Sequence, residues 1–209
     1  MMSDPSDIEG LFARAKAGEE RALSDLFNVY REQLRRMVHL RLDRRLQGSI
    51  DPSEVLQETY REFARELQNY SKESGQPFFL WLRQIVGQKL INLHRQHLGA
   101  NLPNANQEVS LYRGALPQAS PVSLAALLLG RMTSASRLDM RTQTQLRVQE
   151  ALNGMDPMDR EVLTLRHFEM LTSQEAAQVL GIKKSAASNR YINALKRLKE
   201  MVGGIPGWG

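Results

Sequence analysis

The sequence of 209 residues contains no cysteine, and aromatic residues make up only 6% of it. The absence of cysteine excludes disulfide bonds and thiolate metal sites. The longest apolar run, residues 124–129, is far too short to span a membrane. The N-terminus carries acidic residues where a signal peptide has a basic stretch and an apolar run. We therefore expect a cytoplasmic protein without membrane insertion.

Signatures of catalysis are also missing. The sequence contains no P-loop, no nucleophile elbow and no dinucleotide-binding fingerprint. His94 and His97 fall on one face of an expected helix, but no cysteine or carboxylate stands at ligand spacing from them. Asp156 and Asp159 fit a helix N-cap and its first turn better than an acid–base pair. We expect no metal, no cofactor and no enzymatic activity.

Positive charge is in excess, with a formal net charge of +5, and it is clustered. One cluster comprises Lys183, Lys184, Arg190, Lys196, Arg197 and Lys199, and the other comprises Arg31, Arg35, Arg36, Arg41, Arg44 and Arg45. Basic clusters favour a polyanionic partner and salt-sensitive binding. For the second cluster, a solvated helix face explains the pattern equally well.

Apolar residues recur at helical spacing over most of the chain, and no strand pattern occurs. The pattern predicts an all-α fold of two small helical domains, residues 1–98 and 138–202. Residues 99–137 are rich in Asn, Gln, Pro, Ser and Gly, which predicts a flexible linker, although residues 122–129 have the composition of a helical turn. We expect the glycine-rich tail, residues 203–209, to be disordered, and the pattern does not explain Trp208 within it.

Residues 171–198 have the pattern of a helix-turn-helix. Thr172 and Glu175 form a capping box, Gly181 favours a sharp turn, and Ser185 is suited to cap the second helix. The inner face of that second helix comprises Ala187, Tyr191, Ala194, Leu195 and Leu198, and its outer face comprises Ser188, Asn189, Arg190, Asn193 and Arg197. Any tight helix pair shares part of this pattern, but the polar and cationic outer face favours DNA binding.

A second feature is an acidic helix face in a basic protein. Asp51 is expected to cap a helix that Pro52 begins, and its solvent side starts with Asp51, Glu54, Gln57, Glu58 and Glu62. Acidic residues near a helix N-terminus complement the helix dipole and aid solubility. A docking face for a basic partner explains them equally well.

The third feature is a polar loop, residues 69–76, followed by a helix with aromatic residues at its start. Phe78 and Trp81 beside a basic helix face have the chemistry to stack on unpaired bases. Packing in a core is the favoured interpretation for both rings, so the loop and the polar face of the helix are the better candidates for nucleic-acid contact.

Three runs together resemble bacterial RNA polymerase sigma factors of the extracytoplasmic-function (ECF) type, in the sigma-70 family. DPSEVLQETY at residues 51–60 resembles the family's D-A-E-D-L-V-Q-E-T-F run. FLWLRQIV at residues 79–86 resembles F-x-x-W-L-x-x-I-A, and DPMDREVL at residues 156–163 resembles L-P-x-x-x-R-x-V-L, the entry to region four. The resemblance covers about residues 7–98 and 138–200 and implies two domains that correspond to sigma regions two and four.

The resemblance implies roles for the matching residues. For core polymerase, at the β′ clamp helices, they are Asp51, Glu54, Gln57 and Glu58. For the minus-ten element, including a flipped base, they are Asn69, Tyr70, Ser71, Lys72, Arg83, Gln88, Asn92 and Arg95. For the minus-thirty-five element they are Lys184, Ser185, Ser188, Asn189, Arg190, Asn193 and Arg197.

The resemblance also implies the β flap of the polymerase, promoter DNA and an anti-sigma factor as partners. The chain departs from the family pattern where Gly87, Gln88 and Asn92 replace Arg, Asn and Asp, and where Ser188 replaces a basic residue. Residues 99–137 are long for a linker of this family, which leaves room for an extra regulatory contact. The alternative is a helix-turn-helix repressor or activator that binds duplex DNA alone, which would not need the acidic helix face and the aromatic loop.

Overall fold

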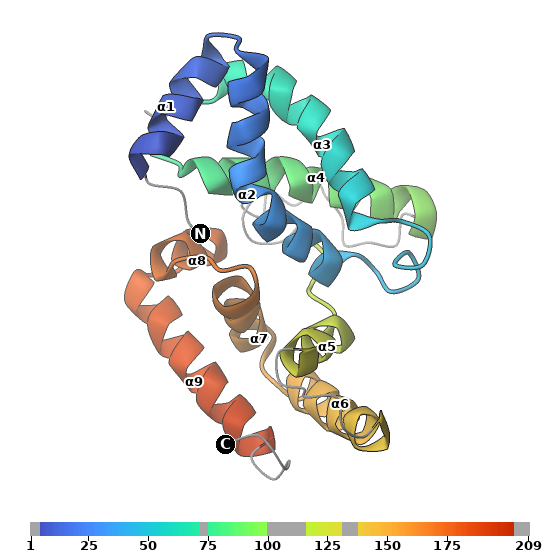
Figure 1. Ribbon diagram of the computed structural model, residues 1–209. Helices are drawn as coiled ribbons and strands as arrows, with labels where there is room; N and C mark the ends of the chain where they lie inside the picture. Colours follow the sequence, from blue (N-terminus) through green and yellow to red (C-terminus); the bar gives the residue numbers. More distant parts are fainter. Residues whose placement is uncertain (1–4, 72–74, 100–115, 131–137, 203–209) are drawn as a thin grey trace.

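The computed structural model describes residues 5–71, 75–99, 116–130 and 138–202 (Figure 1). Every regular element in these ranges is helical, so the all-α prediction is confirmed. The first helices are α1 (Pro5–Lys16), α2 (Glu20–Arg41), α3 (Pro52–Glu66), the short η1 (Leu67–Asn69) and α4 (Phe78–Leu98). The later ones are α5 (Pro121–Gly130), α6 (Leu138–Asn153), α7 (Pro157–Leu163), the π-helical turn η3 (Thr164–Phe168), α8 (Ser173–Leu180) and α9 (Lys184–Val202). None of the helices in these ranges combines the length and apolar character that a membrane span needs.

Short sequence signals set several helix ends. Asp51 and Thr172 each accept a hydrogen bond from the backbone of the next helix, and both helices begin with a complete capping box. Gly181 ends α8 with φ of 61°, in the left-handed region that glycine adopts without strain. The expected N-cap at Ser185 is wrong, because α9 already begins at Lys184 and Ser185 lies within its first turn.

The N-terminal half, α1–α4, lies above the C-terminal half, α5–α9, in the view of Figure 1. Aromatic rings fill the centre of the N-terminal half. Phe78 makes edge contacts with Phe12 and Tyr70 at centroid distances of 5.6 and 5.3 Å, and Trp81 lies 6.1 Å from the buried Phe63. Phe78 and Trp81 therefore pack in the core, which was the favoured interpretation of both rings.

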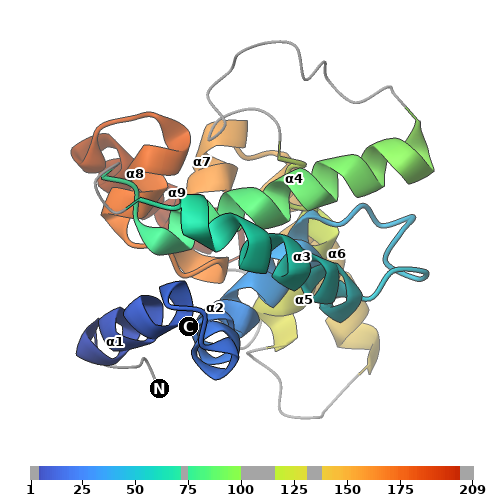
Figure 2. The same cartoon turned by 90° about the horizontal axis from the view of Figure 1, so that it is seen from above.

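The two halves share one apolar core. The larger buried cluster joins Leu34 and Met37 of α2 to Val162, Leu165 and Leu171 of the C-terminal half. Figure 2 shows the same molecule from above, with α7 and α8 on one side of α4 and α1 on the other. The predicted domain limits therefore do not separate two independent cores in this conformation.

Part of the predicted linker is a packed helix. Leu124 and Ala125 of α5 are fully buried, in a cluster that also includes Leu40 of α2 and Leu152 of α6. The amide of Ser120 donates to the carbonyl of Leu40 at 2.9 Å. Leu124, Ala125 and Leu128 of the apolar run thus belong to the core, whereas residues 100–115 and 131–137 lie outside the described residues.

Residue 87 is a glycine because the linker returns across α4 at that point. A Cβ atom on Gly87 would lie 2.5 Å from Cδ2 of Leu116, closer than two carbon atoms approach without a shift. The replacement of the family's arginine by glycine at this position therefore makes room for a segment of the linker.

Candidate nucleic-acid interface

The acidic face of α3, defined as Asp51, Glu54, Gln57 and Glu58, is exposed as predicted from the sequence. Asp51 accepts from the amide of Ser53 at 2.6 Å, and this bond lowers the pKa of its carboxyl group. Glu58 forms an ion pair with Lys89 of α4. The face is therefore an exposed acidic surface, and one of its residues, Glu58, is paired with a cation of α4.

The polar loop departs from the prediction at Tyr70. Its ring is 5% exposed and its hydroxyl donates to the carbonyl of Gln76 at 2.7 Å, which closes the loop on itself. Burial raises the pKa of the hydroxyl. Asn69 and Ser71 are exposed, and Asn69 donates to Glu66 at 3.0 Å. Tyr70 thus supports the loop from the aromatic core, while Lys72 lies outside the described residues.

Arg83, which was also predicted to contact DNA, is buried in this conformation. Its side chain is 3% exposed, and its Nε donates to Glu169 at 2.9 Å. Helix α4 turns Arg83 towards the C-terminal half because its neighbours Leu82 and Val86 are core residues. Gln88, Asn92 and Arg95 are exposed, and Gln88 donates to Asn92 at 3.2 Å. These three side chains form the polar face of α4.

His94 belongs to the interior of the N-terminal half. Its Nε2 accepts a hydrogen bond from the amide of Asp43 at 3.1 Å. Burial lowers its pKa, the charge of Asp43 opposes that shift, and Arg45 adds to it. His97, three residues on, is exposed. One ring is therefore buried and the other lies at the surface.

Helix α9 divides into two faces as its spacing predicts. Ala187 and Ala194 are fully buried and Leu198 is 4% exposed, so the inner face seats the helix on the C-terminal half. On the outer face Lys184, Ser185, Asn189, Arg190, Asn193 and Arg197 are exposed and Ser188 is half-buried. Ile192, 61% exposed, lies among them and was not singled out from the sequence. The outer face is accessible to a groove of duplex DNA.

Arg190 and Arg197 are held by a residue that sequence reasoning assigned only to a helix start. Asp159 is 6% exposed and accepts from Arg190 at 2.6 Å and from Arg197 at 3.3 Å. Arg190 also lies 3.5 Å from the helix-capping Asp156. The first turn of α7 thus orients two cations of α9.

Comparisons with known proteins identify similar sequences for the helix-turn-helix segment and for most of the chain. The family model "Sigma-70, region 4" matches residues 151–200, the segment that contains α7, α8 and nearly all of α9. The ECF RNA polymerase sigma factor SigD of Mycobacterium tuberculosis is 24% identical over 195 residues, 93% of this chain and 84% of that protein. The ECF RNA polymerase sigma factor BldN of Streptomyces coelicolor is 21% identical over 202 residues, 96% of this chain and 67% of that protein.

The chain is therefore similar to ECF RNA polymerase sigma factors over more than nine-tenths of its length, and residues 151–200 match region 4 of the sigma-70 family. The fold of the chain is similar to that of CnrH, solved in complex with the cytosolic domain of CnrY. The TM-score is 0.55 at 21% identity, and the alignment covers 94% of this chain and 97% of CnrH.

One buried charged group was not identified from the sequence. Glu169 lies between η3 and α8, is fully buried, and accepts from Arg41 at 2.6 Å and from Arg83 at 2.9 Å. Arg41 also pairs with Glu161 of α7. Burial alone would raise the pKa of Glu169, but Arg41 and Arg83 lower it by more. Arg41 was counted in a basic surface cluster and is instead part of the interior.

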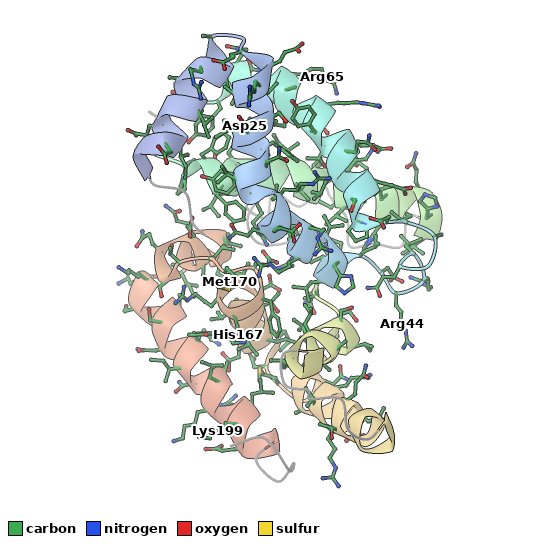
Figure 3. The ribbon with its side chains drawn as sticks, viewed as in Figure 1. Asp25, Arg44, Arg65, His167, Met170 and Lys199 are labelled. Carbon is green, nitrogen blue, oxygen red and sulfur yellow. The ribbon has the colours of Figure 1, made fainter. Side chains whose placement is uncertain are left out.

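The chain turns sharply next to Glu169. The residue after it, Met170, has φ of 61°, in the left-handed region that residues other than glycine rarely adopt, and its side chain is 55% exposed. Figure 3 shows Met170 where the two halves of the molecule meet. The left-handed residue and the π-helical turn before it direct Glu169 inward, so no helical period in the sequence could place its side chain.

Proposed function

We propose that the chain is a sigma factor that binds core RNA polymerase, directs it to specific promoters and helps to melt the DNA there. The support is the combination of an exposed acidic face on α3 with an exposed polar and cationic face on α9. The polymerase performs the chemistry, so the chain has no catalytic residue of its own. We place its action in the cytoplasm, where bacterial transcription occurs.

Core binding is assigned to the acidic face of α3. Two exposed glutamates and an exposed aspartate within two helical turns present a negative surface, and a basic coiled coil such as the β′ clamp helices complements it. A second contact between the C-terminal half and the β flap completes the docking.

Binding of the minus-ten element is assigned to the exposed part of the loop and of α4. Asn69 and Ser71 are exposed in the loop, and Gln88, Asn92 and Arg95 are exposed on the helix. Lys72, which the resemblance adds to this set, lies outside the described residues. Extrusion of a base from the duplex costs a few kcal/mol, because its stacking and pairing are lost. Contacts between the extruded base and the protein must offset that cost. Polar side chains beside a rigid aromatic support, which includes Tyr70, suit that purpose.

Binding of the minus-thirty-five element is assigned to the outer face of α9, which enters the major groove. Asn189 and Asn193 are exposed amides suited to base edges, whereas Lys184, Arg190 and Arg197 are cations suited to phosphates. Ser185 and Ser188 add hydroxyl groups at the start of the helix.

An anti-sigma factor is proposed as a further partner. The support is the similarity in fold to CnrH, whose structure was determined with the cytosolic domain of CnrY.

The test is co-elution with bacterial core RNA polymerase in size-exclusion chromatography. The wild-type chain is expected to co-elute, and the double variant Glu54→Lys/Glu58→Lys is expected not to, because its charges repel a basic partner. The matched control is Glu20→Lys/Asp25→Lys, which makes the same change in net charge on exposed positions of α2 and is expected to co-elute. Circular dichroism checks that the variants are folded, since Glu54 is part of the capping box.

Two results would overturn the proposal. A wild-type chain that elutes apart from core would favour the helix-turn-helix repressor or activator that binds duplex DNA alone. A double variant that binds core as well as the control would remove the acidic face of α3 from the interface.

A further inference from the structure

The buried ion pairs of this chain connect its two halves. Arg41 comes from α2, Arg83 from α4 and Glu169 from the turn after η3, and their side chains are 1%, 3% and 0% exposed. Glu169 accepts from Arg41 at 2.6 Å and from Arg83 at 2.9 Å. The cations therefore belong to the N-terminal half and the anion to the C-terminal half.

Neighbouring bonds join the same elements. Gln33 of α2 donates to the backbone carbonyl of Glu169 at 2.7 Å. Arg41 donates through Nη1 to the carbonyl of Pro117 at 3.0 Å, so the segment before α5 is fixed at the same place. Two side chains of α2 and one of α4 thus hold residue 169 and the linker together.

Arg83 depends on this contact more than Arg41 does. Arg41 also pairs with Glu161, whereas Glu169 is the only carboxylate among the described residues that pairs with Arg83. Nη2 of Arg83 is already buried without a hydrogen-bond partner. A buried charge that loses its partner is strongly unfavourable, and separation of the halves would return it to water.

If the chain has the proposed function, this closed arrangement is too short to reach both promoter elements at once. Elements centred near minus ten and minus thirty-five are separated by roughly 25 base pairs, or about 85 Å at ~3.4 Å per base pair. A compact chain of this length has a radius of gyration of about 17 Å and is therefore roughly 45 Å across. The halves must move apart before both elements are bound at once.

We propose that Arg41, Arg83 and Glu169 form an autoinhibitory latch that holds the two halves of the chain closed. The exposed faces of α3 and α9 allow a first contact with core polymerase or DNA, and full engagement requires the latch to open. Binding that favours the open state shifts the equilibrium by its difference in affinity for the two states.

The experiment measures the separation of the halves by fluorescence energy transfer. Because the chain has no cysteine, labels react only at introduced thiols. Arg65→Cys on α3 and Lys199→Cys on α9 are exposed positions, one in each half, and both are labelled in Figure 3. Glu169→Gln removes the anion at nearly constant volume, and Glu32→Gln is the matched control because it breaks an exposed ion pair within α2.

The latch predicts high transfer in the wild type and in Glu32→Gln, and low transfer in Glu169→Gln. It also predicts that Glu169→Gln binds core polymerase about 5- to 150-fold more tightly, the range typical of coupling between a conformational change and binding. A triple variant, Arg41→Met/Arg83→Met/Glu169→Leu, replaces the three fully buried charges of the latch by apolar side chains, which gain nothing from contact with water, and it is expected to keep high transfer.

Thermal melting shows whether each variant is folded. If Glu169→Gln does not fold, Arg83→Gln repeats the test by removing the cation of the same ion pair. High transfer in the folded Glu169→Gln or Arg83→Gln variant would overturn the latch, whatever the chain binds. Loss of transfer without any binding to core would support the latch and refute the proposed function.

Discussion

Arg190 of α9 donates to Oδ1 of Asp159 in α7 at 2.6 Å. Oδ2 of the same carboxylate accepts from Arg197 at 3.3 Å. One nearly buried aspartate therefore fixes two cations on the helix that we assign to DNA recognition. The contact relates the stability of the C-terminal half to the orientation of its DNA-binding face.

Replacement of Asp159 by alanine is expected to lower the free energy of unfolding. The loss should be about 1–2 kcal/mol, between the value of an exposed ion pair and that of a buried hydrogen bond to a charged group. Urea denaturation measures it, and Asp25→Ala on the exposed side of α2 is the control with the same change in charge. Equal stability of the two variants would show that the contact contributes nothing.

Replacement of Arg190 by alanine is expected to weaken promoter binding. If the guanidinium contacts a phosphate, the logarithm of the binding constant should also depend less steeply on salt, by about one in slope. Fluorescence anisotropy at several salt concentrations measures both quantities. Arg65→Ala removes an exposed arginine of α3 and should change neither. A slope like that of the wild type would restrict Arg190 to its pairing with Asp159.

His94 predicts a pH dependence of stability. Burial lowers its pKa in the folded chain below the unfolded value of about 6.5. The unfolded state therefore binds the proton more tightly, so the contribution of neutral His94 is complete above about pH 6.5 and is lost as the pH falls.

The measurement is the free energy of unfolding between pH 5 and 8. In His94→Gln the decline below pH 6.5 should be smaller than in the wild type, whereas His97→Gln, exposed on the same helix, should keep it. The assignment to His94 fails if both variants follow the wild-type curve.

Local signals in the sequence are sufficient for most helix boundaries. The capping boxes at Asp51 and Thr172 and the left-handed Gly181 depend on residues only a few positions apart, and the structure contains all three. The helical spacing of apolar residues also predicts the two faces of α9 correctly, because that helix packs along one side only.

The contacts between the halves were not predictable in this way. Arg41 and Glu169 are 128 residues apart, and Arg83 and Glu169 are 86 apart. From the sequence alone, a polar residue on a helix is predicted to be exposed unless its distant partner is known. For that reason Arg83 was assigned to DNA and Arg41 to a surface cluster, and Glu169 was not considered.

The central claim is that the chain gives core polymerase its promoter specificity, and in vitro transcription tests it most directly. Purified core polymerase is combined with the chain and with DNA from upstream of its own gene, and the transcripts are mapped at their 5′ ends. The account predicts a defined start site with the wild-type chain and none with Glu54→Lys/Glu58→Lys. The same transcripts from core polymerase alone, or none with the wild-type chain on any promoter of a genomic library, would contradict it.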